Sequence, residues 1–176
     1  DCPVVFLLNP PVAKLGEIYP ENYYSFSGEA GRALLQRVKL FIEVRMFRKL
    51  FKRLPGEALS VLDIGGGSGW LLDSIKLADS RVAKTWIVDI DAGAKAVAES
   101  RGHNFFCGRI EDFCNVIRFD LIVVLNLLEH VADPTALIRK LSDLIKPPGL
   151  ILVKTPNIDT LDRYIFQKHN WGGLHC

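Results

Sequence analysis

An acidic residue and three glycines alternate at residues 61–70, which read VLDIGGGSGW: Asp63, Gly65, Gly67 and Gly69. The stretch joins an apolar run to a predicted helix. Alternating glycines let a bound molecule approach the bare backbone at several successive points. The free N–H groups at the start of the next helix can bind an anionic group, either a phosphate or a carboxylate. The stretch therefore predicts a cofactor-binding loop.

The residues of this stretch do not fit two common phosphate-binding loops. The dinucleotide fingerprint requires a glycine at its sixth position, and counting from Gly65 that position holds Trp70. Counting from Gly66 instead puts Ser68 at the third position, which also requires glycine. A P-loop needs a Gly-Lys-Ser/Thr sequence, and no lysine occurs between Arg53 and Lys76. The loop therefore favours a different kind of cofactor.

Other residues that could do chemistry follow predicted strands further along the chain. Asp89 ends an apolar strand, and its carboxylate can accept hydrogen bonds from two ribose hydroxyls; Asp91 is a weaker candidate. Glu129 and His130 follow a later strand, and a histidine can take up a proton near neutral pH. Packing or capping within a turn is the alternative role for His130. The carboxyl ends of parallel strands share one edge of a sheet, where ligands bind.

These residues depend on an alternation of strands and helices. Apolar runs predict strands at residues 59–64, 84–89, 103–107, 119–125 and 150–154. Helical patterns separate them, ending near residue 77 and covering residues 92–101 and 134–145, with a helical turn at residues 111–116. The sequence Pro147-Pro148-Gly149 predicts a break before the last strand. This order predicts an α/β fold, a Rossmann-like doubly wound parallel sheet with helices on both faces.

The N-terminal segment has a different texture. Proline density predicts an irregular arm at residues 1–27, followed by a domain at residues 28–176. Apolar residues at helical spacing predict a helix from Gly28 to Leu54, which Pro55-Gly56 ends. The same helix carries many basic residues. They favour a solvated outer face, with an anionic partner as the alternative.

Bulk composition narrows the functional classes. The 176 residues carry a formal net charge of +2, so the overall charge does not indicate a nucleic-acid partner. No apolar stretch approaches the roughly 20 residues that a membrane span needs. The four cysteines (Cys2, Cys107, Cys114 and Cys176) are scattered, which predicts free thiols in a reducing cytoplasm rather than disulfides or a zinc site.

Several motifs together carry a family resemblance. VLDIGGGSGW resembles the first motif of class I S-adenosylmethionine-dependent methyltransferases. WIVDID at residues 86–91, FCGRIED at 106–112, FDLIVVLNLLEHVADP at 119–134 and LIKPPGLILVKTPN at 144–157 resemble later motifs in the family's order. Together they resemble the branch of ubiquinone-type O-methyltransferases and small-metabolite enzymes, over about residues 20–176. The resemblance implies S-adenosyl-L-methionine as cofactor, S-adenosyl-L-homocysteine as product, and a small-molecule acceptor methylated on oxygen.

The resemblance also implies roles for individual residues. Glu129 and His130 would be catalytic. Arg109 stands where many relatives carry Asp, so Glu111 or Asp112 would take the adenine contact. Tyr23, Tyr24 and Trp171 would line the acceptor pocket, with ordinary packing as the alternative. The implied cofactor-binding residues are Asp63, Gly65, Gly66, Gly67, Gly69, Asp89, Ile90, Ile110, Glu111 and Asn126.

Three further expectations follow from the family pattern. Some relatives bind a divalent ion through Glu-x-x-Glu-His and a later histidine. Asn126 replaces the first carboxylate here, and an amide oxygen binds Mg²⁺ more weakly, so we predict no metal; a metal bound with the help of His169 or His175 is the alternative. The family's sheet gains a strand pair after its fifth strand, and we expect that pair to be missing from this chain. Two alternative functions stay open: an RNA methyltransferase using the basic helix, and a non-catalytic S-adenosylmethionine-binding module.

Overall fold

A parallel five-stranded sheet forms the centre of the protein, whose computed structural model describes residues 31–114 and 117–157. The strand order is β3-β2-β1-β4-β5, and every neighbouring pair is parallel. The first strand along the chain, β1, therefore lies in the middle of the sheet. β2 and β3 follow on one side of it, and β4 and β5 lie on the other side. The strands are β1 (Leu59–Ile64), β2 (Val82–Asp89), β3 (Asn104–Cys107), β4 (Phe119–Leu125) and β5 (Ile145–Lys154).

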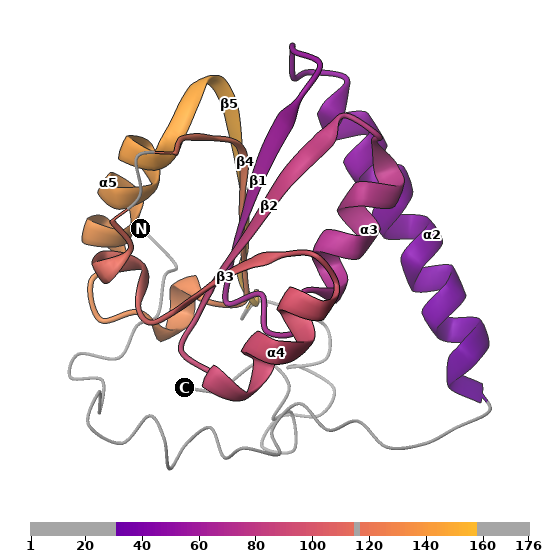
Figure 1. Cartoon of the computed structure of the whole chain (residues 1–176), viewed down its shortest axis with the longest axis horizontal. Coiled ribbons are helices and arrows are strands. Elements are labelled where there is room, and N and C mark those ends of the chain that lie inside the picture. The colour runs from indigo at the N-terminus through magenta and orange to yellow at the C-terminus, as the bar shows by residue number, and fades with distance from the viewer. Residues whose placement is uncertain (1–30, 115–116, 158–176) are drawn as a thin grey trace.

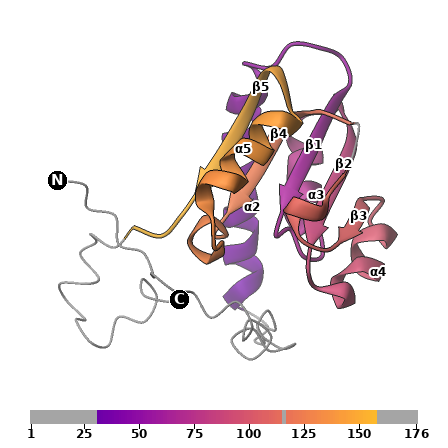
Figure 2. The same cartoon turned by 90° about the vertical axis from the view of Figure 1, so that its left-hand side faces the viewer.

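Helices cover both faces of this sheet, as Figures 1 and 2 show. One apolar cluster joins α2, α3 and α4 to one face, with Phe47, Leu72 and Ala98 fully buried. A second cluster packs α5 on the other face through Leu137 and Leu141. The predicted doubly wound fold is confirmed. The helical elements are α2 (Gly31–Phe51), α3 (Trp70–Ala78), α4 (Ala92–Ser100), α5 (Pro134–Leu144) and the short 3-10 helices η2 (Ile110–Asp112) and η3 (Leu128–His130).

Burial on both faces explains why the central strands read as continuous apolar runs. All six residues of β1 are buried, and residues 121–124 of β4 are buried as well. Their side chains alternate between the two clusters: Val61 packs towards α2 and α3, while Leu62 packs towards α5. Such strands carry no polar alternation, as is typical of parallel sheets.

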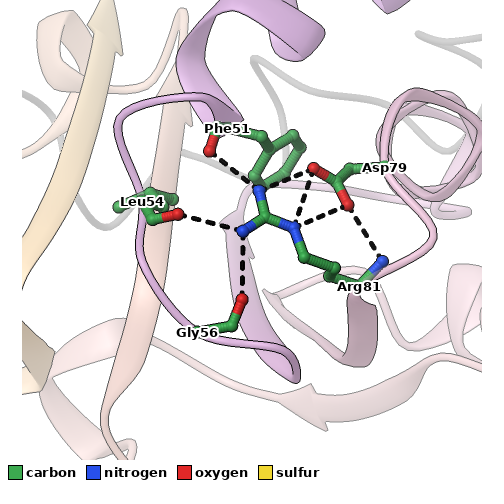
Figure 3. Close-up of polar contacts among 5 residues, drawn as sticks. All are labelled: Phe51, Leu54, Gly56, Asp79 and Arg81. Atoms are coloured by element: carbon green, nitrogen blue, oxygen red, sulfur yellow. Dashed lines mark hydrogen bonds and ion pairs between the residues drawn. The ribbon is translucent and has the colours of Figure 1, made fainter.

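An arginine fixes the end of α2 to the sheet (Figure 3). The guanidinium of Arg81 donates to the backbone carbonyls of Phe51 (2.9 Å), Leu54 (3.0 Å) and Gly56 (3.0 Å), and it pairs with Asp79 at 2.8 Å. The last carbonyls of a helix have no partner within the helix, so a fork of N–H donors satisfies them. α2 ends at Phe51 rather than at the predicted Leu54.

The prediction of a break at Pro147-Pro148-Gly149 is wrong. β5 begins at Ile145, directly after α5, and includes all three residues. Its pairing with β4 shifts register between Phe119 and Leu121, opposite this stretch. Proline lacks the N–H that a regular ladder requires, so it fits where the ladder is irregular. β2 also begins two residues earlier than predicted, at Val82, and the turn predicted at residues 111–116 is a 3-10 helix at Ile110–Asp112.

A polar cluster connects three strands at the edge of the sheet where their amino-terminal ends lie, opposite the edge that carries the glycine loop. Asp120 accepts hydrogen bonds from the Ser60 backbone N–H (2.7 Å) and from the Lys146 ammonium (2.8 Å). Burial would raise the pKa of Asp120, but these hydrogen bonds outweigh it and lower that pKa. The three residues belong to β4, β1 and β5. Ser60 and Lys146 line a cavity of about 280 Å³ together with Lys84 and Arg118. This edge is remote from the glycine loop and carries none of the predicted site residues.

Candidate functional site

The glycine loop lies between β1 and α3, next to the point where the strand order reverses. β1 pairs with β2 on one side and with β4 on the other, so the crevice beyond its carboxyl end is bounded by loops from both. In open α/β sheets this switch point is the usual ligand site. Gly65, Gly67 and Gly69 all have positive φ angles, of 75°, 49° and 82°. Such angles are strained for residues with a Cβ, which accounts for the alternation of glycines.

Two of the predicted residues meet directly at this edge. The backbone N–H of Gly67 donates to Oδ2 of Asp89 at 2.8 Å, and Oδ1 of Asp89 accepts from the Asp91 N–H at 2.9 Å. The Gly65 N–H donates to the Val88 carbonyl at 2.8 Å. The loop is therefore attached to the end of β2. Each Asp89 oxygen retains a lone pair for a further donor, such as a hydroxyl.

Asp63 lies beneath the loop and is 2% exposed. A Cβ built at Gly66 would stand 2.6 Å from its Oδ2 atom, so Gly66 is required for close packing rather than for an unusual φ angle. That oxygen is buried and receives no hydrogen bond within the described part of the chain. Burial, with a further contribution from the negative charge of Asp89, raises the pKa of Asp63 to about 7.

The segment after β4 approaches the loop from the other side. A Cβ at Gly65 would lie 3.7 Å from the Leu127 side chain. Asn126 has a φ of 51°, and its N–H donates to the Lys154 carbonyl at 2.7 Å, so it turns the chain sharply at the end of β4. Non-glycine residues with a positive φ angle are often found at functional sites.

Glu129 and His130 follow in the short helix η3. Their side chains are only 18% and 15% exposed, and Nε2 of His130 stands 3.9 Å from Oε1 of Glu129. Both Glu129 oxygens are buried and receive no hydrogen bond from the residues that the structure describes. A buried acceptor of this kind is complementary to a donor from a ligand or a protonated base.

The remaining predicted cofactor residues have different surroundings. Ile90 follows Asp89 and is 62% exposed, an apolar side chain on the surface beside the site. Ile110 is 5% exposed and packs in the α5-side core, so its side chain is used in the fold. Glu111 is exposed and pairs with Arg109 at 3.3 Å. Tyr23, Tyr24 and Trp171, together with the arm at residues 1–27, lie outside the described residues.

Other sequence-based expectations can be placed as well. Cys107 and Cys114 are free and exposed, while Cys2 and Cys176 lie outside the described residues. Among the described residues no three His, Cys, Asp or Glu side chains gather into a possible metal site, and His169 and His175 fall outside that range. No helix of the described part is long and apolar enough to cross a membrane. Those basic residues of α2 whose side chains are described are exposed: Arg37, Lys39, Arg45, Arg48 and Lys49.

Sequence reasoning missed one buried polar residue beside the loop. His103 is 3% exposed and bonds to Thr85 and Asp73, and its ring lies against Gly69. The sequence contained a signal for this residue, because a glycine, Gly102, directly follows the predicted helix at residues 92–101. The residue after a helix-ending glycine commonly packs back against the helix, and Gly102 has the positive φ of such a glycine, 77°.

The family model described as a methyltransferase domain matches residues 35–175. The chain belongs to the methyltransferase domain family. The class I resemblance found in the motifs is thereby confirmed at the level of the family.

Two curated relatives of this methyltransferase domain are ubiquinone biosynthesis O-methyltransferases. The protein from Neisseria meningitidis serogroup C is 30% identical over 108 residues, covering 55% of this chain and 44% of its own. The mitochondrial protein from Dictyostelium discoideum is 31% identical over 123 residues, covering 59% and 37% respectively. The matched part therefore spans less than half the length of these relatives.

Solved structures share the fold of this methyltransferase domain. The plantazolicin methyltransferase BpumL, crystallised with SAH and a monoazolic desmethylPZN analog, gives a TM-score of 0.59 at 23% identity over 74% of this chain and 50% of its own. The sugar N-methyltransferase KedS8 from Streptoalloteichus gives 0.59 at 18% identity over 79% and 59%. Both neighbours are less than 25% identical to this chain, so they establish the fold alone.

Proposed function

We propose that this methyltransferase domain binds S-adenosyl-L-methionine and transfers its methyl group to an oxygen of a small-molecule acceptor. The observation that carries the proposal is the hydrogen bond from the Gly67 N–H to Asp89 at 2.8 Å. It brings the glycine loop and the strand-end carboxylate to one place at the switch point of the sheet. The relatives that act in ubiquinone biosynthesis support an oxygen acceptor.

The residues present fit this cofactor. Asp89 would accept the ribose hydroxyls, and Ile90 offers an exposed apolar surface beside it for the adenine. The first N–H groups of α3 suit the carboxylate of the methionine end. Asp63 provides a buried carboxyl oxygen that receives no hydrogen bond from the described residues, and an ammonium group at that same end would stabilise its ionised form. Asn126 and Glu111 complete the set from β4 and η2.

Bound at this site, the cofactor supplies an activated methyl group on a sulfonium whose leaving group is neutral. The chain's residues then have two tasks. The glycine loop and Asp89 hold one reactant in a fixed place, and positioning alone can contribute roughly 7 to 11 kcal/mol. Glu129 and His130 would take up the proton of the acceptor hydroxyl, with Glu129 stabilising the imidazolium at 3.9 Å.

Calorimetric titration with S-adenosylmethionine, S-adenosylhomocysteine, NAD and ATP tests the cofactor. We expect binding of the first two ligands alone. Asp89→Ala should weaken that binding by about 1.5–3 kcal/mol, because two hydrogen bonds to a charged acceptor are lost. Asp143→Ala, which removes an exposed acid from α5, is the matched control and should leave affinity unchanged. Absence of S-adenosylmethionine binding would rule out the proposal.

Transfer of a labelled methyl group identifies the acceptor. A mixture of small phenolic and hydroxylated metabolites should become labelled, and hydriodic acid should release the label under conditions that leave N-methyl groups in place. The exposed basic residues of α2 favour RNA as the second candidate. RNA methylation would require salt-dependent RNA binding and labelling of total RNA. Cofactor binding without transfer to either pool would indicate a non-catalytic module.

A further inference from the structure

His103 occupies a defined place at the end of α4. The Gly102 N–H donates to the Glu99 carbonyl at 2.9 Å, and the His103 N–H donates to the Ala98 carbonyl at 3.1 Å. These two bonds, with the positive φ of Gly102, form a Schellman motif. The motif turns the residue after the glycine inward, where an apolar side chain is usual. Here the inward residue is a histidine whose side chain is fully buried.

Both ring nitrogens of His103 have partners. Nε2 lies 3.1 Å from Oδ1 of Asp73, and Nδ1 lies 2.8 Å from the Thr85 hydroxyl. An ionised carboxylate only accepts, so Nε2 carries the hydrogen and donates it. In a neutral ring Nδ1 is then the acceptor for the Thr85 hydroxyl, and the two contacts together select the Nε2–H tautomer. Burial lowers the pKa of His103, and the charge of Lys76 lowers it further, so the neutral form is favoured.

The same ring lies against the glycine loop. A Cβ at Gly69 would stand 2.5 Å from Cδ2 and 3.1 Å from Nε2 of His103. The Gly69 N–H donates to the Gly66 carbonyl at 3.0 Å, and the Gly69 carbonyl accepts from the Asp73 N–H at 3.1 Å. His103 therefore touches the last loop glycine and binds the side chain of the residue that closes the first turn of α3. Arg101 also pairs with Asp73.

Burial excludes a direct chemical role for the imidazole of His103 and the hydroxyl of Thr85, whereas Asp73 is partly exposed. Thr85 is 1% exposed, so its hydroxyl cannot reach a substrate. The three groups come from α3, the end of α4 and β2. Their arrangement connects these elements beneath the loop.

We propose that His103, held in its neutral Nε2–H form between Thr85 and Asp73, is a positioning residue that fixes Gly69 and the first turn of α3 for binding the methionine end of the cofactor. The proposal rests on the proposed function, because it assigns the loop to S-adenosylmethionine. The contacts of His103 with Thr85, Asp73 and Gly69 are already present in the free protein. They can therefore be tested with and without the cofactor.

Thr85→Val and Thr85→Ser form the central pair of variants. Valine keeps the shape but removes the hydroxyl, whereas serine keeps the hydroxyl. Leu141→Ala, which creates a cavity under α5 on the other face, serves as a control for general destabilisation. In the free protein, amide hydrogen exchange at residues 66–73 should become about tenfold faster in Thr85→Val, the scale of one lost buried hydrogen bond, and should stay near wild type in Thr85→Ser.

Long-range proton–nitrogen NMR spectra report the tautomer. Nε2 of His103 should be protonated and Nδ1 unprotonated at pH 7. The opposite tautomer would overturn the proposal. So would loop exchange in Thr85→Val that matches wild type, or that rises no more than in a Leu141→Ala protein of equal stability.

Calorimetry then tests the consequence for binding. Thr85→Val should weaken S-adenosylmethionine binding about tenfold, while Thr85→Ser and Leu141→Ala remain within about twofold of wild type. Equal affinity of Thr85→Val and wild type would overturn the positioning role. If the wild-type protein binds no S-adenosylmethionine, the proposed function fails and the role of His103 in cofactor binding fails with it. The hydrogen-exchange and NMR measurements on the free protein still test whether His103 holds Gly69 and α3 in place.

Discussion

Asp63 on β1 and Asp89 at the end of β2 lie on neighbouring strands at one edge of the sheet, close enough for the negative charge of Asp89 to act on Asp63. Burial of Asp63, reinforced by the charge of Asp89, raises its pKa to about 7. Asp89 is half-buried and accepts two backbone hydrogen bonds. Two acids on adjacent strands thus have different environments, and this difference has a measurable effect on stability.

Stability should depend on the ionisation of Asp63. Its pKa is raised from 3.8 to about 7 on folding, so the folded protein binds more protons between these values and stability falls as pH rises from about 4 to 7. The slope is about 1.4 kcal/mol per pH unit at most. Urea unfolding at pH 5 to 9 should show the stability of Asp63→Asn rising relative to wild type as pH increases, with the difference levelling off above about pH 8.

The comparison with Asp63→Asn matters because His103 contributes with the opposite sign. Its pKa is lowered on folding, so its contribution to stability is lost as pH falls below about 6.5. Subtracting the two proteins' unfolding free energies cancels this term. A pH-independent difference would show that Asp63 titrates normally.

Gly66 and Gly67 should respond differently to substitution. Gly66→Ala places a Cβ 2.6 Å from Asp63 and should reduce the free energy of unfolding by about 1–3 kcal/mol through overpacking. Gly67 has a φ of 49° with nothing within 4 Å of its Cβ direction, so Gly67→Asn should cost no more than about 1 kcal/mol. Gly67→Asn should still lose cofactor affinity, because its side chain enters the open crevice. Unfolding and calorimetry on both variants provide the check, and unchanged affinity in Gly67→Asn would place the cofactor elsewhere.

Glu129 and His130 should affect turnover rather than cofactor binding. His130→Ala should lower kcat about 10²–10⁴-fold, the usual contribution of a general base, with the affinity for S-adenosylmethionine within about twofold of wild type. Glu129→Gln should lower kcat less and shift the pH profile towards lower pH, since the carboxylate favours the imidazolium. Initial rates from pH 5 to 9 measure both effects. A kcat of His130→Ala within tenfold of the wild-type value would show that His130 has a packing role rather than a catalytic one.

Arg81 should be important for stability although it is far from the loop. Arg81→Lys replaces a planar fork by a single ammonium, which cannot reach three carbonyls and Asp79 together. The urea midpoint should fall, and cofactor affinity per folded molecule should be unchanged. Arg53→Lys, an exposed exchange of the same type, is the control. Equal midpoints for both variants would show that solvent replaces the Arg81 bonds without cost.

Much of the molecule could be predicted from local pattern. The strands β1 and β4 are continuous apolar runs because both of their faces are covered, and such runs need no tertiary information to be recognised. The start of α5 was clear from Asp133-Pro134, and the structure shows the Asp133 side chain accepting from the Ala136 N–H at 2.9 Å. Trp70 excluded a dinucleotide loop because one side chain breaks the spacing.

Other features depended on contacts between distant segments. The sequence Pro147-Pro148-Gly149 indicates a break when read alone, yet β4 lies alongside and tolerates the irregular pairing. Gly66 and Gly69 look equivalent in the sequence, but one is required by the Asp63 carboxylate and the other by the His103 ring together with a positive φ.

The sequence by itself determined the order of the strands along the chain, the glycine loop and the acids near the ends of β1 and β2, because hydrophobic runs and glycine spacing are local properties of the chain. Only the tertiary structure decided the partner of each polar group. Asp63 acquires its raised pKa, and His103 its tautomer, from residues up to 30 positions away that folding brings within hydrogen-bond distance or into the same buried space. Burial and pairing are properties of the folded surroundings, and the amino-acid letters alone do not contain them.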